Sequence, residues 1–147
     1  MREIPEPTRF CASSNFLCKP NGRGLCLVTD LRLLNGATQQ VGWPFWSTTD
    51  LHQNILQDSK LFWSLDFLSG YYQVALSEDS QPLTTFITPF RKFCYQRLPQ
   101  GWSNSGDYFN FLTDGMTKDL DRVMKSVDDL LGQCRSLQEA YDTLAEV

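Results

Sequence analysis

An aspartate interrupts the most apolar run of the chain. Asp66 follows Phe62-Trp63-Ser64-Leu65 and precedes Phe67-Leu68, a composition typical of a strand buried on both sides. An ionised carboxylate among such neighbours is costly unless a partner compensates its charge. The run therefore predicts a strand that ends at a carboxylate in need of a counter-charge.

A second pair of carboxylates lies in SVDDLLG (126–132), which reads as a hairpin with Asp128-Asp129 at its bend. Adjacent like charges repel, and a divalent cation removes that repulsion together with the burial cost of Asp66. Hard oxygen ligands suit Mg²⁺ or Mn²⁺. If the strand ending at Asp66 lies beside the hairpin, the three carboxylates converge and can hold two ions. The alternative stays open, because surface Asp-Asp pairs are common and an aspartate at a strand end often caps a turn.

The rest of the chain reads as alternating strands and helices. Residues 1–24 look irregular, 61–67 is followed by a break at Ser69-Gly70, and Ser136 with Glu139 has capping-box spacing ahead of a last helix. The other expected elements are a strand over 25–30, a helix over 48–57, strands over 71–76, 83–88 and 92–98, and a helix over 105–123. This order predicts an α+β fold, an antiparallel sheet with helices on one face.

Composition excludes several classes of protein. With 147 residues, 41% hydrophobic and 20% charged, the chain suits one globular domain or two subdomains. No apolar run approaches a membrane span, and the charged, proline-containing first residues do not resemble a secretory signal. We therefore expect no membrane partner and an intracellular protein, in the cytoplasm or nucleus, with five reduced cysteines. His52 is the single histidine, which disfavours Ser-His-Asp chemistry, and the net charge of −4 does not by itself favour a nucleic-acid partner.

Five segments, in order, resemble the reverse transcriptases of LTR retrotransposons and retroviruses. They are LVTDLRLLN (27–35), LDFLSGYYQVAL (65–76), LTTFITPF (83–90), LPQGWSNSGDYF (98–109) and SVDDLL (126–131). The resemblance implies a polymerase palm, about 40–73 and 105–147, with partial fingers, about 1–39 and 74–104. The chain ends soon after the hairpin, so we expect the thumb and RNase H domain to be absent and the activity incomplete or weak.

The resemblance also implies a site. Asp66, Asp128 and Asp129 match the catalytic aspartates, and with the Phe67 carbonyl they would hold two Mg²⁺ or Mn²⁺ ions. For the substrates, Tyr71 matches the aromatic gate beneath the sugar, Gln100 the glutamine at the incoming nucleotide, and Asp30 and Arg32 positions near the template. The implied reaction is RNA-directed DNA polymerisation, with an RNA or DNA template, a primer and deoxynucleoside triphosphates as partners. The oligomeric state is not implied.

Two positions depart from the family pattern. Cys26 stands where the family normally has an arginine that grips the triphosphate, and a thiol supplies neither charge nor a bidentate fork. We expect weakened nucleotide affinity, with Lys19 and Arg23 binding the phosphates instead. Ser126 stands where the motif often has tyrosine, a position that varies.

Other interpretations remain open. A non-catalytic, retroelement-derived remnant could keep the fold as a scaffold or interaction module, and a cyclase-like or other nucleotidyl-transferring palm would share the carboxylates. Without the resemblance, Tyr71, Tyr72 and Phe109 are more simply core aromatics, LPQGW (98–102) a turn, and Arg32 a surface charge.

Overall fold

The computed structural model describes residues 1–19, 22, 24–44 and 47–147, which form two compact units. The first unit comprises Met1–Val41 and Tyr71–Ser105, and the second comprises Gly42–Gly70 and Gly106–Val147. Each unit has its own sheet and its own helices, so the predicted α+β class is confirmed. The assignment of fingers and palm along the chain stays a prediction.

The first unit contains a five-stranded sheet in the order β1-β6-β5-β2-β3. Its strands are β1 (Arg2–Glu3), β2 (Ala12–Cys18), β3 (Leu25–Thr29), β5 (Phe86–Ile87) and β6 (Lys92–Cys94). β2 pairs antiparallel with β3 and parallel with β5. The expectation that residues 1–24 are irregular is therefore wrong, because pairing with β3 and β5 makes a strand of the mostly exposed segment Ala12–Cys18.

Short helices replace two of the strands predicted for this unit. Its helices are α1 (Arg32–Ala37), the 3-10 helix η1 (Gln81–Thr84), and α3 (Gly70–Gln73), which begins at the boundary between the units. The strand predicted over 71–76 is thus wrong at its start, and that over 83–88 shrinks to Phe86–Ile87. Ser69 has a left-handed φ of 54° and turns the chain ahead of α3. Pro82 has no N–H for a ladder, which favours η1.

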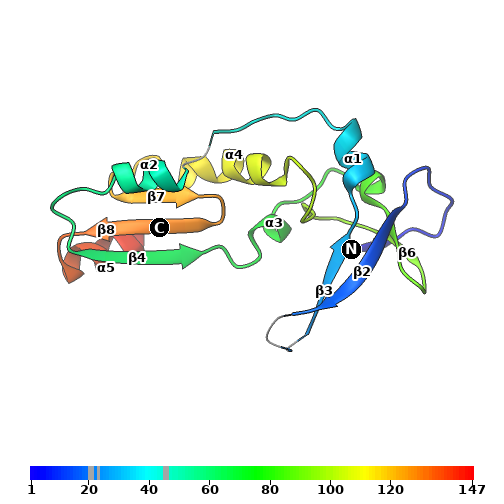
Figure 1. Ribbon diagram of the computed structural model, residues 1–147, viewed down its shortest axis with the longest axis horizontal. Helices are drawn as coiled ribbons and strands as arrows, with labels where there is room; N and C mark the ends of the chain where they lie inside the picture. Colours follow the sequence, from blue (N-terminus) through cyan, green and yellow to red (C-terminus); the bar gives the residue numbers. More distant parts are fainter. Residues whose placement is uncertain (20–21, 23, 45–46) are drawn as a thin grey trace. The chain divides into compact units, whose positions relative to one another are not determined.

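The second unit contains a three-stranded antiparallel sheet in the order β4-β8-β7 (Figure 1). The strands are β4 (Leu61–Asp66), β7 (Val123–Ser126) and β8 (Asp129–Cys134). β8 is the central strand. The expectation of a strand buried on both sides is wrong, because Phe62 and Leu65 point to opposite faces of β4 and are 52% and 40% exposed. The apolar composition of β4 predicts a strand, but it does not show how much of that strand is exposed.

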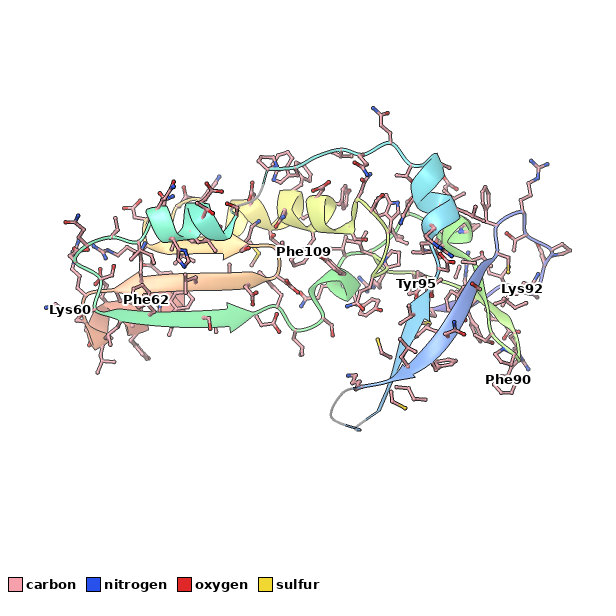
Figure 2. The ribbon with its side chains drawn as sticks, viewed as in Figure 1. Lys60, Phe62, Phe90, Lys92, Tyr95 and Phe109 are labelled. Atoms are coloured by element: carbon pink, nitrogen blue, oxygen red, sulfur yellow. The ribbon has the colours of Figure 1, made fainter. Side chains whose placement is uncertain are left out.

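Three helices belong mainly to this unit: α2 (Thr48–Gln53), α4 (Ser105–Thr117) and α5 (Leu137–Glu146). α5 begins where predicted, since the Ser136 hydroxyl accepts a bond from the Glu139 N–H. α4 ends earlier than predicted, because 118–122 turns ahead of β7. Phe109, on α4 and labelled in Figure 2, is 2% exposed and meets the Phe67 ring edge-to-face at 5.3 Å, so its interpretation as a core aromatic is confirmed. No helix among the described residues is long and apolar enough to span a bilayer.

Candidate active site

The sheet of the second unit brings two of the predicted aspartates together. Asp66, the last residue of β4, is directly opposite Asp129, the first residue of β8, and Asp129 is directly opposite Ser126 on β7. Such Cα partners lie about 4.5–5.5 Å apart, and their side chains share one face of the sheet. Asp66, Asp129 and Ser126 therefore form a row across the three strands.

Asp128 lies in the turn beside this row. The turn of the β7–β8 hairpin consists of Val127 and Asp128, so the predicted bend at Asp128-Asp129 is corrected by one residue: Asp129 already belongs to β8. The Phe67 N–H donates to the Asp128 carbonyl at 3.0 Å and ties the turn to the end of β4. Val127 has a left-handed φ of 57°, a conformation that two-residue hairpin turns require and that favours glycine.

The three carboxylates are exposed, which changes the physical argument made from the sequence. Burial of Asp66 does not create the need for a counter-charge, because Asp66 is exposed. The need comes from like charges placed directly opposite each other on neighbouring strands, which is destabilising. Three adjacent carboxylates suit a hard divalent cation in their chemistry. Over the described ranges, no three His, Cys, Asp or Glu side chains are arranged as a metal-binding group.

The Phe67 carbonyl, predicted as a further metal ligand, lies at the same end of β4. It accepts a bond from the Gly70 N–H at 3.2 Å. A carbonyl oxygen has two lone pairs, so one acceptor position is left by this bond. The main chain at Phe67 is thus held from both sides, by Asp128 and by Gly70.

The remaining predicted residues belong to the first unit. Arg32 is exposed and forms a bidentate pair with Asp30, at 2.8 Å from Nε and 2.6 Å from Nη2. This guanidinium lowers the pKa of Asp30 to about 2. Lys19 and Gln100 are exposed, Tyr71 is half-buried in α3, and Arg23 lies outside the described residues. Cys26, half-buried in β3, is directly opposite Leu17.

Sequence reasoning missed one residue beside the site. Lys125, on β7, has a side chain only 6% exposed, and its ammonium group is bonded to α4. A lone lysine inside the apolar strand Val123–Ser126 was the available signal. Lysine is almost never buried unless its charge is paired.

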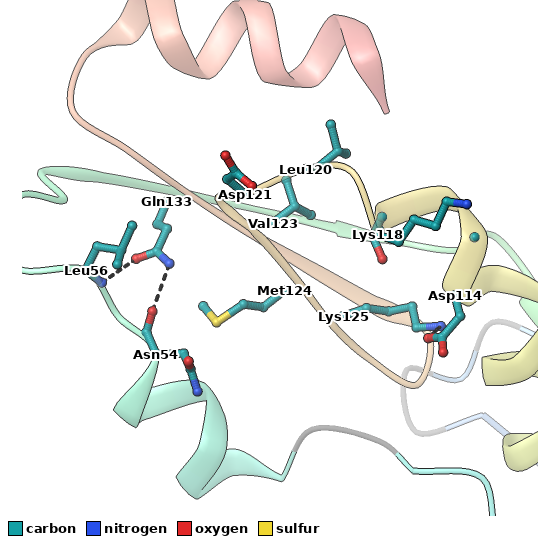
Figure 3. Close-up of a pocket in the computed structure, with 12 residues that line it drawn as sticks. Asn54, Leu56, Asp114, Lys118, Leu120, Asp121, Val123, Met124, Lys125 and Gln133 are labelled. Carbon is teal, nitrogen blue, oxygen red and sulfur yellow. Dashed lines mark hydrogen bonds and ion pairs between the residues drawn. The ribbon is translucent and has the colours of Figure 1, made fainter.

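The second unit also contains a cavity of about 540 Å³ next to Lys125 (Figure 3). Its wall includes the end of α4, Lys118, Leu120, Asp121, β7 and Gln133. Gln133 is buried and accepts bonds from the Leu56 N–H and the Ser59 hydroxyl, at 2.8 and 3.0 Å. None of the three carboxylates lines this cavity.

Residues 17–147 match the family model described as reverse transcriptase (RNA-dependent DNA polymerase). The retrovirus-related Pol polyprotein from transposon opus of Drosophila melanogaster is 30% identical over 130 residues, 85% of this chain and 12% of that protein. A putative enzymatic polyprotein of Cassava vein mosaic virus is 27% identical over 77% of this chain and 17% of its own length. An RNA-directed DNA polymerase homolog of Oenothera berteroana is 29% identical over 73% of this chain and 76% of its own length.

Solved structures of foamy virus protease–reverse transcriptases share the fold. One in complex with double-stranded DNA superimposes with a TM-score of 0.87 over 97% of this chain, 25% of that chain, at 22% identity. The prototype foamy virus protein gives a TM-score of 0.86 over 97% of this chain, 19% of that chain, at 23% identity. A polymerase-type α+β fold, as the sequence predicts, is thus confirmed.

Proposed function

Because the chain belongs to the reverse transcriptase (RNA-dependent DNA polymerase) family, we propose that it is the catalytic module of an RNA-directed DNA polymerase. The module would add a deoxynucleotide to a primer 3′-hydroxyl by metal-assisted nucleotidyl transfer. One observation carries the proposal: Asp66 and Asp129 are paired in register across β4 and β8, with Asp128 in the adjoining turn. The chain spans about an eighth of the opus polyprotein that it matches, so the activity is proposed for this segment.

The carboxylates of Asp66, Asp128 and Asp129 suit a divalent cation in their chemistry. Asp66 and Asp128 would hold the ions, Asp129 would support them, and the Phe67 carbonyl would add an uncharged oxygen. Two bound Mg²⁺ or Mn²⁺ ions supply activation of the attacking hydroxyl and stabilisation of the leaving pyrophosphate. The protein needs no nucleophile of its own, since positioning and electrostatic stabilisation lower the barrier.

Residues of the first unit would bind the substrates. Among the described residues, the bonds of the Arg32 guanidinium to Asp30 involve its Nε and Nη2, and its other N–H donors suit a template phosphate. Tyr71 would lie beneath the sugar of the incoming nucleotide, and Gln100 would contact that nucleotide. Lys19 and Arg23 would bind the triphosphate in place of the arginine that Cys26 replaces.

The test is single-nucleotide primer extension with Mg²⁺ and with Mn²⁺. Asp66→Asn and Asp128→Asn should each abolish incorporation with Mg²⁺, because each removes a charged metal ligand. Asp119→Asn, an exposed aspartate between α4 and β7, is the matched control and should extend like the wild type. Incorporation retained by both site variants would remove these residues from the mechanism.

A second candidate function rests on Cys26. The missing arginine favours a non-catalytic remnant that keeps the fold as a scaffold or interaction module. Such a protein would fold, bind no divalent ion at Asp66 and show no incorporation even with Mn²⁺. The wild-type arm of the primer-extension assay separates the two candidates.

A further inference from the structure

Lys125 is the only charged residue that is buried among the described parts of the chain. Its side chain is 6% exposed. Burying an ammonium group costs several kcal/mol unless each donor is bonded and the charge is paired. A lysine at this position therefore calls for a specific set of partners.

Those partners all come from α4. The Lys125 Nζ donates to the Asn110 carbonyl and to the Thr113 hydroxyl, each at 2.9 Å, and lies 2.9 Å from the Asp114 Oδ1. Three acceptors match the three N–H donors of an ammonium group. Figure 3 shows the Lys125 and Asp114 side chains meeting end to end at one side of the cavity.

Asp114 is itself held in place. Its Oδ2 accepts a bond from the Trp43 indole N–H at 3.1 Å. Partial burial alone would raise the pKa of Asp114, but the bonds from Lys125 and Trp43 outweigh it and hold that pKa below its usual range. Lys125 is thus bonded to a carboxylate that stays ionised and has a second anchor in the chain.

Lys125 and its bonds to α4 lie immediately before the carboxylate site along the chain. Lys125 is directly opposite Leu130, and the next residue, Ser126, is directly opposite Asp129. Since neighbouring residues on a strand point to opposite faces, Lys125 points toward α4 while Asp66, Asp129 and Ser126 point the other way. Val127 and Asp128 follow at once. The bonds of Lys125 therefore fix the position and the rotation of β7, the strand that leads into the turn at Val127 and Asp128.

We propose that Lys125 is a positioning residue for the metal-binding carboxylates, acting through its bonds to α4. The inference rests on the proposed function. β7 is an edge strand of the sheet, pairs with β8, and is four residues long. The three bonds to α4 supply the second attachment that the sheet does not give it. Without these bonds β7 can shift against β8, and the carboxylate of Asp128 shifts with it.

The experiment measures Mn²⁺ binding by calorimetry, and by the electron paramagnetic resonance signal of the bound ion, on the full chain. Lys125→Met keeps the length of the side chain and removes the ammonium group. We expect about tenfold weaker Mn²⁺ binding, the lower end of what groups that orient metal ligands contribute, and an altered signal of the bound ion. Lys118→Met, an exposed lysine outside the Lys125 network, is the matched control and should bind Mn²⁺ like the wild type.

Circular dichroism and thermal unfolding separate positioning from loss of the fold. A folded Lys125→Met that binds Mn²⁺ with wild-type affinity and an unchanged signal overturns the proposal. If that variant does not fold, Asp114→Asn replaces it in the test: the bonds to Asn110 and Thr113 remain, and we expect a folded protein with several-fold weaker binding. Wild-type affinity in a folded Asp114→Asn would then refute the positioning role. A wild-type protein that binds no Mn²⁺ overturns the proposed function and this inference with it.

Discussion

Gly132 allows β4 and β8 to pair beneath a tryptophan. Gly132 is directly opposite Trp63, and a Cβ added to Gly132 would lie less than 3.0 Å from three atoms of the Trp63 indole. Gly132→Ala must therefore displace the ring or separate the strands. Overpacking of this kind costs up to about 3 kcal/mol, and the lower chain freedom of alanine returns roughly 1 kcal/mol. We expect a net loss of about 2 kcal/mol in the free energy of unfolding.

The loss should appear as a lower midpoint in urea and a fall in Tm of about 4–8 °C, given roughly 2–4 °C per kcal/mol for a chain of this size. Gly115→Ala is the matched control. Gly115 lies within α4, where an added Cβ meets nothing within 4 Å, so alanine should stabilise the helix by roughly 0.5–1 kcal/mol. A Gly132→Ala protein as stable as the wild type would refute the close approach of Trp63. It would also put the register that aligns Asp66 with Asp129 in doubt.

Three further predictions follow from single positions. Val127→Gly relieves the left-handed φ of a β-branched residue. It should raise the free energy of unfolding by about 0.5 kcal/mol, after subtraction of the freedom that glycine adds to the unfolded chain. A loss above about 1 kcal/mol in urea unfolding would contradict the turn geometry. The guanidinium groups of Arg122 and Arg135 hold the pKa of Asp58 below its usual range. The ionised Asp58 therefore stabilises the fold above the unfolded pKa of about 3.9, and this contribution is lost as pH falls through the lower folded pKa. Asp58→Asn should flatten the plot of unfolding free energy against pH below about pH 4, and an unchanged plot would contradict this. Cys26→Arg restores a charged phosphate ligand and should lower the KM for a deoxynucleotide about tenfold, the contribution of one charged hydrogen bond. The control is Cys11→Arg at an exposed cysteine, which should leave the KM unchanged. Equal KM values for the two variants would argue against Cys26 as a nucleotide-binding position.

The approach of Asp66 to the aspartate hairpin could be predicted because its signals are local. Asp66 at the end of an apolar run and two aspartates in a short hairpin define two strand ends, and antiparallel pairing brings them together. The N-cap of α5 is local in the same sense, since Ser136 and Glu139 are three residues apart. The reason given for a counter-charge was wrong, because Asp66 is exposed and an apolar composition does not show how much of a strand is exposed.

The elements that were wrong depend on distant partners. Ala12–Cys18 is a strand because β3 and β5 pair with it, although its first half contains Ser13-Ser14-Asn15. The aromatic run at 71–76 reads as a strand, yet the left-handed Ser69 and the packing of Phe109 against Gly70 start a helix there. Lys125 was missed because the acceptors that pair its charge lie on another element, α4, and the sequence does not show that the two elements pack together.

Calorimetric titration of Mn²⁺ into the wild type, Asp66→Asn and Asp119→Asn tests the central claim most directly, because it needs neither template nor nucleotide. Carboxylates aligned across β4 and β8 predict a Mn²⁺ site that is present in the wild type and in Asp119→Asn and is lost in Asp66→Asn. Equal binding by all three proteins, or no binding by any of them, would contradict it.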